Sequence, residues 1–241
     1  MKRIVVCTDS HGNKIDPKAH ELFRKFVSEY KPQLRLHLGD WMDAEAFRNG
    51  ASEHERRVGL KEDADAALDF MSWYKPTHVL DGNHDDRLPL YAKHSPGPLA
   101  DYVVEILSRA SDLYAKHGTL HLPYDKRKGV LQIGGLRALH GFFSGVSAPQ
   151  QTARAFGDCI FGHLHRFTTV SVPNMGKSAV ARGIGALCRL DMEYNSRQVN
   201  ALAQSQGWAY GVIDYQGRYW LANAEIFAGQ VAVSDNFRIL R

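Results

Sequence analysis

The chain has 241 residues, of which 44% are hydrophobic and 23% charged, and its formal net charge is +4 at neutral pH. This composition is typical of a globular protein with a substantial buried core, and it excludes disordered and fibrous classes. A membrane-spanning helix needs about 18 consecutive apolar residues. No run of that length occurs here, so we expect no membrane association.

The first half of the chain alternates between short apolar runs and segments of helical periodicity. The apolar runs predict strands at Lys2–Thr8, Leu34–Leu38 and Thr77–Leu80. Apolar residues at helical spacing predict amphipathic helices over residues 19–30, 60–71 and 99–113. The run Ile4–Cys7 is too short for the core of a signal peptide and indicates a buried strand.

The second half is rich in predicted strands separated by Gly, Pro and Asn. They are expected at Val130–Ile133, Leu136–Leu139, Cys159–Phe161, Phe167–Val172, Trp208–Tyr215 and Tyr219–Phe227. We expect mainly antiparallel pairing here, with residues 166–241 completing a second sheet. The pattern indicates an α/β protein with two packed sheets and outer helices. Because no repeat or Gly/Ser linker interrupts the chain, residues 1–241 are predicted to form a single domain.

The three cysteines, Cys7, Cys159 and Cys188, are odd in number and far apart in the chain. This spacing excludes a disulfide framework and a CxxC zinc site. We therefore predict buried free thiols and a reducing, cytoplasmic compartment. The net charge is too small to indicate a nucleic-acid-binding protein by itself.

Polar blocks rich in Asp, His and Asn follow five of the short apolar runs. In chain order they are Asp9-Ser10-His11-Gly12, Gly39-Asp40-Trp41-Met42-Asp43, Gly82-Asn83-His84-Asp85, His140-Gly141 and Gly162-His163-Leu164-His165. Ligand sites in open α/β sheets lie beyond the carboxyl ends of the strands, so these blocks are expected to converge. Asp9 and His11, like His163 and His165, are two residues apart, and we expect each pair to point to one side of an extended segment.

Carboxylate, imidazole and amide ligands together suit borderline divalent cations: Mn²⁺, our first choice, or Fe, Zn, Ni or Co. Two such ions about 3.5–4 Å apart can clamp a phosphate and hold a bridging hydroxide as the nucleophile. Asp40 is the best-placed carboxylate to bridge them. His84 is then available as a general acid for the leaving oxygen, with Asp43 orienting its ring.

In combination, the five blocks resemble the signature of the calcineurin-like metallophosphoesterase family: DxH, GDxxD, GNH followed by an acid, a single His, and GHxH. The resemblance extends over residues 9–165. It implies a four-layer α/β/β/α sandwich of two mixed sheets with flanking helices and a dinuclear metal centre. It also implies one metal bound by Asp9, His11, Asp40 and His165, and a second bound by Asp40, Asn83, His140 and His163. By the same resemblance, His84 is the catalytic histidine and Asp43 its partner.

The single-histidine block is the least specific of the five. His140 is supported only by the adjacent Gly141, and His121 lies in a similar apolar context between Leu120 and Leu122. Because no glycine flanks His121, we predict that His140 is the ligand.

Two departures from the protein Ser/Thr phosphatases of this superfamily bear on the substrate. Those enzymes carry GDxxDRG and GNHE, whereas here Asp43 precedes Ala44-Glu45 and His84 precedes Asp85. The differences favour phosphodiester or nucleotide substrates, nucleic acid included, over phosphoproteins. Two alternatives stay open: a phosphomonoesterase, including a protein phosphatase, and a non-catalytic scaffold with the same fold.

Side chains next to the blocks are candidates for substrate contact. Arg87 and Arg166 are close enough in sequence to reach a phosphate oxygen, with a solvated surface arginine as the equal alternative for each. Trp41, Phe142 and Phe143 could line a base, but aromatic residues beside metal ligands more often pack to hold them. Further candidates at the border of the site are Arg182, Arg189 and Tyr194.

Overall fold

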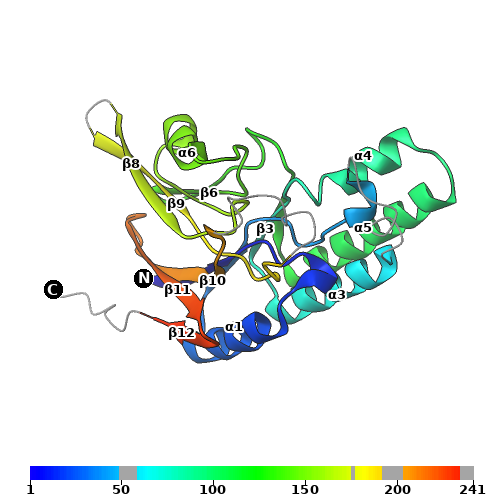
Figure 1. Ribbon diagram of the computed structural model, residues 1–241, viewed down its shortest axis with the longest axis horizontal. Coiled ribbons are helices and arrows are strands. Elements are labelled where there is room, and N and C mark those ends of the chain that lie inside the picture. The colour runs from blue at the N-terminus through cyan, green and yellow to red at the C-terminus, as the bar shows by residue number, and fades with distance from the viewer. Residues whose placement is uncertain (49–58, 175–176, 192–202, 234–241) are drawn as a thin grey trace.

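The computed structural model describes residues 1–48, 59–174, 177–191 and 203–233. The described strands form two sheets (Figure 1), one of seven strands and one of five. The first sheet has the order β12-β11-β10-β1-β2-β3-β4, and the second has the order β5-β6-β7-β9-β8. In both sheets, some neighbouring strands run parallel and others run antiparallel. The resemblance to the calcineurin-like metallophosphoesterase family implies such mixed sheets.

The parallel half of the first sheet consists of β1 (Lys2–Cys7), β2 (Leu34–His37), β3 (His78–Leu80) and β4 (Leu120–Leu122). On the other side of β1 lie the antiparallel strands β10 (Gln206–Ile213), β11 (Tyr219–Phe227) and β12 (Gln230–Ala232). The second sheet contains β5 (Leu131–Ile133), β6 (Leu136–Leu139), β7 (Cys159–Phe161), β8 (Thr168–Asn174) and β9 (Lys177–Gly183).

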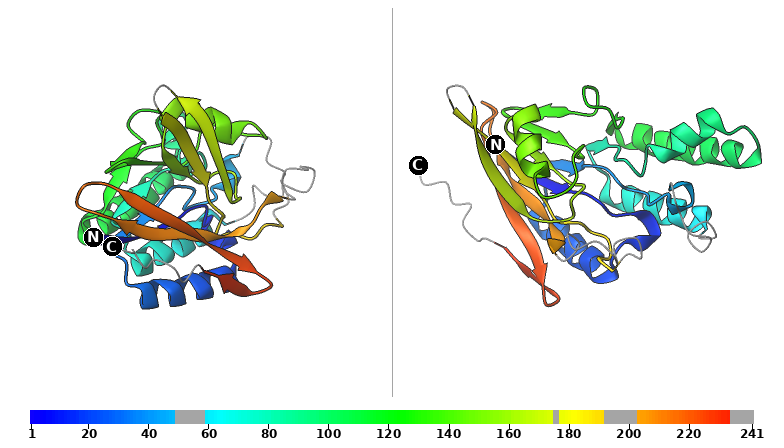
Figure 2. Two further views of the ribbon diagram at one scale, coloured as in Figure 1. Left: turned by 90° about the vertical axis from the view of Figure 1, so that its left-hand side faces the viewer. Right: turned by 45° about the horizontal axis from the view of Figure 1, so that its top comes forward.

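Among the described residues, five helices lie outside the sheets: α1 (Pro17–Tyr30), α3 (Leu60–Tyr74), α4 (Arg87–His94), α5 (Pro98–His117) and α6 (Ala148–Phe156). Two short 3₁₀ helices, η1 (Gly12–Lys14) and η2 (Glu45–Phe47), follow the first two polar blocks. Figures 1 and 2 show α6 on the opposite side of the two sheets from α1 and α3.

Three apolar cores separate four layers. Alternation along β1 sends Val5 into the core beneath the helices of the first sheet, while Ile4 and Val6 face the second sheet. Phe161 on β7 packs with Ala153 of α6 in the third core. The order is therefore helix, sheet, sheet, helix, which confirms the expected α/β/β/α sandwich. Because both faces of the central strands are buried, β1 from Ile4 to Cys7 and β7 from Cys159 to Phe161 are continuous apolar runs.

The predicted elements agree with the structure in order, but α4, α6, β4, β9 and β12 were not expected. One prediction was wrong: residues 166–241 do not simply complete the second sheet. Strands β8 and β9 do so, whereas β10 pairs antiparallel with β1 of the first sheet. The expectation of mainly antiparallel pairing in the second half is confirmed for β5 with β6, β8 with β9, β10 with β11 and β11 with β12, whereas β7 runs parallel to both β6 and β9. Sheet membership depends on pairing between segments far apart in the chain, which local pattern does not specify.

In the described part of the chain, no helix combines the length and the apolar character needed to cross a lipid bilayer. Cys7, Cys159 and Cys188 are buried free thiols, as predicted. The reducing compartment inferred from them stays a prediction.

Candidate metal centre

The polar blocks converge at the carboxyl ends of β1, β2, β3, β6 and β7, and backbone hydrogen bonds join their loops. The N–H of Asp9 donates to the carbonyl of Gly39, and that of His11 donates to Asp40, each at 3.0 Å. In the second sheet, the N–H of Gly162 donates to His140 at 2.8 Å. The N–H of His84 donates to Oδ1 of Asp40 at 2.8 Å and that of His163 donates to Oδ2 of Asp9 at 3.0 Å, so all five predicted blocks meet in one place.

The backbone of the candidate ligands is unusual. Asp9, His11, Asp40, His163 and His165 all have positive φ, between 50° and 65°. The segments are therefore not extended, and the argument that alternation along an extended segment orients Asp9 and His11 was wrong. Left-handed conformations at non-glycine residues concentrate at functional sites, where the surrounding structure enforces them.

The first group of side chains surrounds Nε2 of His11. This atom lies 3.9 Å from Oδ1 of Asp9 and 3.9 Å from Oδ2 of Asp40. Nε2 of His165 lies 3.4 Å from Nε2 of His11 and 3.2 Å from Oδ1 of Asp9. All four side chains are buried. They are the four residues predicted for the first metal.

The second group surrounds Nε2 of His140, which lies 3.2 Å from Oδ2 of Asp40 and 3.1 Å from Oδ1 of Asn83. Ligand atoms of Asp40, His140 and His163 lie within 4.8 Å of one another. Oδ2 of Asp40 thus stands between the two groups, where the predicted bridging carboxylate would have to be.

His121, the competing histidine, lies outside both groups. It belongs to β4, where its Nε2 contacts Oδ1 of Asp81 at 2.8 Å. His140 therefore occupies the predicted position in the second group and His121 does not.

The donor set fits divalent cations. Oδ1 of Asp9 is buried and has no hydrogen-bond partner in the described structure, which is costly unless a cation compensates it. Burial alone would raise the pKa of Asp9, but His165 and His140 hold it well below its usual range. Burial lowers the pKa of His163 to about 4, aided by His140. Ionised carboxylate and neutral imidazole are the states that bind metals.

Neighbouring groups raise the pKa values of two other imidazoles, those of His140 and His165. Burial alone would lower the pKa of His140, but Asp40 raises it. Cys188 and Asp9 likewise raise the pKa of His165 against the effect of burial. These rings supply positive charge to the buried carboxylates, a role that a bound cation would take over.

Asp43 contacts the rings of two histidines. Nδ1 of His84 lies 3.0 Å from Oδ1 of Asp43 and 2.7 Å from its carbonyl oxygen. The same Oδ1 lies 2.8 Å from Nδ1 of His11. The first contact was predicted. The second was not, because no local pattern links Asp43 to a residue 32 positions earlier.

Two buried aspartates that sequence reasoning missed hold the ligand loops. Asp85 accepts hydrogen bonds from the N–H groups of Asp40 at 2.7 Å, Gly82 at 2.8 Å and Met42 at 3.0 Å. Its position directly after His84 was noted only as a departure from GNHE. Its carboxylate ties the loop after β2 to the loop after β3.

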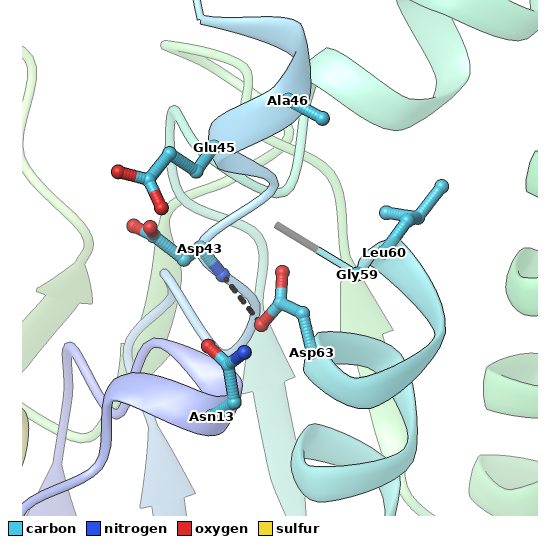
Figure 3. Close-up of a pocket in the computed structure, with 7 residues that line it drawn as sticks. All are labelled: Asn13, Asp43, Glu45, Ala46, Gly59, Leu60 and Asp63. Carbon is cyan, nitrogen blue, oxygen red and sulfur yellow. Dashed lines mark hydrogen bonds between the residues drawn. The ribbon is translucent and has the colours of Figure 1, made fainter. Parts of the chain in front are cut away.

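Asp63 of α3 supports the other end of the loop after β2. It accepts hydrogen bonds from the N–H of Asp43 at 3.3 Å and of Ala44 at 2.8 Å. Figure 3 shows the carboxylate of Asp63 reaching the backbone of Asp43 beside a small pocket that Asn13 and Glu45 also line. The only sequence signal for this role is an acid on the otherwise apolar face of the helix.

The predicted arginines contact the backbone of the loops around the site. Arg87 begins α4 and donates to the carbonyl of Asp43 at 3.0 Å, next to His84. Arg166 donates to the carbonyl of Gly145 at 3.3 Å. Both are therefore placed beside the ligand loops, and their contact with substrate stays a prediction.

Of the three aromatic residues that could line a base, two contact neighbouring side chains. Trp41 is buried and its Nε1 donates to Asp81 at 3.2 Å, and Phe142 stacks on Tyr124 with ring centroids 4.8 Å apart. Phe143 is half-buried.

The border candidates do not strengthen the site. Arg182 lies over the ring of Tyr219, 5.8 Å from its centroid, and Arg189 is exposed. Tyr194 lies outside the described residues.

Comparison with solved structures gives distant similarities. An archaeal phosphodiesterase is 11% identical, with 92% of this chain and 99% of that chain covered and a TM-score of 0.46. Vps29 from Entamoeba histolytica, complexed with zinc, is 13% identical, with coverage of 95% and 96% and a TM-score of 0.48. A metallophosphoesterase from Sphaerobacter thermophilus is 14% identical, with coverage of 94% and 88% and a TM-score of 0.48.

Comparison with curated proteins gives no significant match. The family model for calcineurin-like phosphoesterases, in contrast, matches residues 2–167. The matched segment contains all five polar blocks, strands β1 to β4 of the first sheet and strands β5 to β7 of the second. The chain therefore belongs to the calcineurin-like phosphoesterase family.

Proposed function

We propose that this protein is a dinuclear metal-dependent phosphoesterase that hydrolyses phosphodiester or nucleotide phosphoester bonds. The observation that carries the proposal is the position of Oδ2 of Asp40, 3.9 Å from Nε2 of His11 and 3.2 Å from Nε2 of His140. A carboxylate shared in this way suits two neighbouring cations. We assign Asp9, His11, Asp40 and His165 to one cation, and Asp40, Asn83, His140 and His163 to the other.

Bound there, two divalent cations would polarise the phosphate and supply a hydroxide nucleophile at neutral pH. Mn²⁺ is our first candidate, and Fe, Zn, Ni and Co also suit this mixture of oxygen and nitrogen donors.

In this proposal, His84 gives a proton to the leaving oxygen. Its Nδ1 is held by Asp43 at 3.0 Å, and its Nε2 points into the site, 3.9 Å from Oδ2 of Asp40. Because the carboxylate holds the ring through Nδ1, Nε2 faces the site, where it can carry the proton that the leaving group needs. Arg87 and Arg166 would bind the non-bridging phosphate oxygens, for which the guanidinium fork is well shaped.

The test is hydrolysis of bis-p-nitrophenyl phosphate by the purified protein with Mn²⁺. We expect activity that EDTA abolishes and that His84→Ala reduces, with a larger reduction for a diester whose leaving alcohol needs a proton than for p-nitrophenolate. His94→Ala, at an exposed position on α4, is the matched control. Activity that survives both EDTA and His84→Ala contradicts the mechanism.

The same assay with p-nitrophenyl phosphate separates a phosphodiesterase from a phosphomonoesterase. We expect the diester to be preferred, and a panel of nucleotides and short nucleic acids would then define the substrate. A non-catalytic scaffold predicts two bound cations per chain with no hydrolysis of either ester. The contact of His84 with Asp43, with Arg87 alongside, favours the enzyme.

A further inference from the structure

Three candidate ligand histidines have different partners at the ring nitrogen that faces away from the centre. Nδ1 of His11 lies 2.8 Å from a carboxylate oxygen of Asp43. Nδ1 of His140 lies 3.0 Å from the carbonyl oxygen of Leu38. Nδ1 of His165 lies 3.8 Å from the sulfur of Cys188.

In each of the three rings, Nε2 is the nitrogen that faces the other candidate ligands. Nε2 of His165 lies 3.2 Å from Oδ1 of Asp9, and Nε2 of His140 lies 3.2 Å from Oδ2 of Asp40. Metal-binding imidazoles generally donate their outer N–H to a fixed acceptor, which determines the tautomer and the orientation of the ring. Carboxylate and carbonyl oxygens are usual acceptors, and a cysteine sulfur is a weak one.

The backbone around Cys188 is held by the ligand loop itself. The N–H of Cys188 donates to the carbonyl of Asp9 at 3.0 Å, and that of Leu187 donates to the same oxygen at 3.2 Å. On the other side, Gln206 donates through Nε2 to the carbonyl of Cys188 at 2.8 Å. The thiol is fully buried. The sulfur is therefore fixed relative to Asp9 and is not a mobile surface group.

The sulfur is also close to the centre, since ligand atoms of His11, His165 and Cys188 all lie within 4.8 Å of one another. We propose that Cys188 is a positioning residue for the first metal, whose sulfur accepts a hydrogen bond from Nδ1–H of His165 and so leaves Nε2 for the cation. The inference rests on the proposed dinuclear centre. It gives the Cys188 side chain a role that no block of the sequence indicated.

The test measures metal binding and not hydrolysis. Binding of Co²⁺ to the metal-free protein is followed by competition with a chromogenic chelator, for the wild type, Cys188→Ala and Cys188→Ser. Removing the outer partner of a ligand typically costs 10- to 100-fold in affinity, so we expect about a 10-fold loss at one of two sites in Cys188→Ala. Serine keeps an acceptor, and we expect Cys188→Ser to stay within about threefold of the wild type.

Cys159→Ala is the matched control, because Cys159 is an equally buried thiol that lies on β7 and packs in the third core. It should bind both ions like the wild type. Thermal unfolding of each metal-free variant separates lost affinity from lost stability. Unchanged affinity in Cys188→Ala, or equal losses in Cys188→Ala and Cys159→Ala, would overturn the inference.

The Co²⁺ spectrum distinguishes a positioning role from direct ligation. Direct ligation by sulfur gives an intense near-ultraviolet charge-transfer band, and we expect none in the wild type. Such a band, lost in Cys188→Ser, would overturn the positioning role. This test and the test of the proposed function can fail independently. Two bound ions without hydrolysis would contradict the proposed enzyme, and the metal affinity of Cys188→Ala would still test the positioning role of Cys188.

Discussion

The carboxylate of Asp43 lies 3.0 Å from Nδ1 of His84, through the same oxygen that lies 2.8 Å from Nδ1 of His11. One side chain therefore orients both the proposed general acid and a proposed metal ligand. Burial alone would raise the pKa of Asp43, but His11 and His84 hold it far below its usual range. Asp43 is thus ionised in the fold, as an acceptor for both rings must be.

The loss of kcat on removing His84 should depend on the leaving group. For a diester with a poorly stabilised alcohol, we expect His84→Ala to lower kcat by roughly 100- to 10,000-fold, the usual contribution of general acid catalysis. With p-nitrophenolate, which leaves with little help from a proton, the loss should be much smaller. Metal content, measured by elemental analysis, should not change. An equal loss for both leaving groups would contradict the assignment.

Asp43→Asn should differ from His84→Ala, because it disturbs two rings. We expect it to lower kcat and also to weaken metal binding by roughly 10-fold, through His11. Chelator competition measures the second effect. A variant that binds metal like the wild type would show that the contact with His11 contributes nothing to affinity.

The contact between Gly82 and Asp40 leaves no room for a side chain. A Cβ at position 82 would lie 2.1 Å from Oδ1 of Asp40 and 2.5 Å from its backbone nitrogen. We expect Gly82→Ala to displace the bridging carboxylate, abolish binding of at least one cation, and cost about 1–3 kcal/mol of stability through overpacking. Calorimetric titration with Mn²⁺ and urea unfolding measure the two effects.

Gly135→Ala is the control, because a Cβ there would meet only ordinary contacts of 3.4 Å or more. It should bind metal normally. Normal metal binding by Gly82→Ala would contradict the proposal that Asp40 must keep its present position to bridge two cations.

Asp63 should make the stability of the metal-free protein depend on pH. Burial, together with the neighbouring Asp43, raises the pKa of Asp63 from 3.8 to about 6. A carboxyl with a raised pKa in the fold contributes its full stability below pH 3.8, and that contribution is lost as the pH rises through about 6. These values correspond to a loss of about 2 kcal/mol between pH 4 and pH 7.

Urea unfolding with EDTA at pH 4 to 8 tests this dependence. We expect the stability of the wild type relative to Asp63→Asn to fall as the pH rises across this window. Asp69→Asn, at an exposed position on the same helix, should give no such trend. A constant difference between the wild type and Asp63→Asn would show that Asp63 titrates as in the unfolded chain.

Metal binding should stabilise the fold, because a cation would compensate the buried carboxylates of Asp9 and Asp40. Free cation at about 100 times its dissociation constant adds about 2.7 kcal/mol. For a chain of this size, we expect a rise in Tm of about 5 °C or more with Mn²⁺, reversed by EDTA. Asp40→Ala should remove most of this rise, and a rise that persists in Asp40→Ala would place the cation elsewhere.

Much of the candidate site could be predicted from the sequence. Each polar block directly follows an apolar run, and strands of an α/β sheet end at a common edge, so order along the chain was enough to predict convergence. The residue types then indicated the chemistry, since carboxylate, amide and imidazole donors together suit divalent cations. The reason first given for the direction of Asp9 and His11 was nevertheless wrong, because both have left-handed backbones.

The supporting contacts could not be predicted, because each joins residues far apart in the chain. Asp85 reaches the N–H of Asp40, 45 positions earlier, and Cys188 reaches His165, 23 positions earlier. Such contacts depend on how the loops fold over one another, and they produce no periodic pattern in the amino-acid sequence. The addition of β10 to the edge of β1 is of the same kind.

The amino-acid sequence by itself predicted most of the strands in their order along the chain and the donor chemistry of the five polar blocks. The sequence favoured His140 over His121 through its neighbouring glycine alone, and the tertiary structure added that β4 directs His121 to Asp81, outside the second group. Only the tertiary structure decided that Asp43 serves two histidines. The physical reason is that periodicity records which face of an element is buried, whereas contacts between loops depend on the packing of whole sheets.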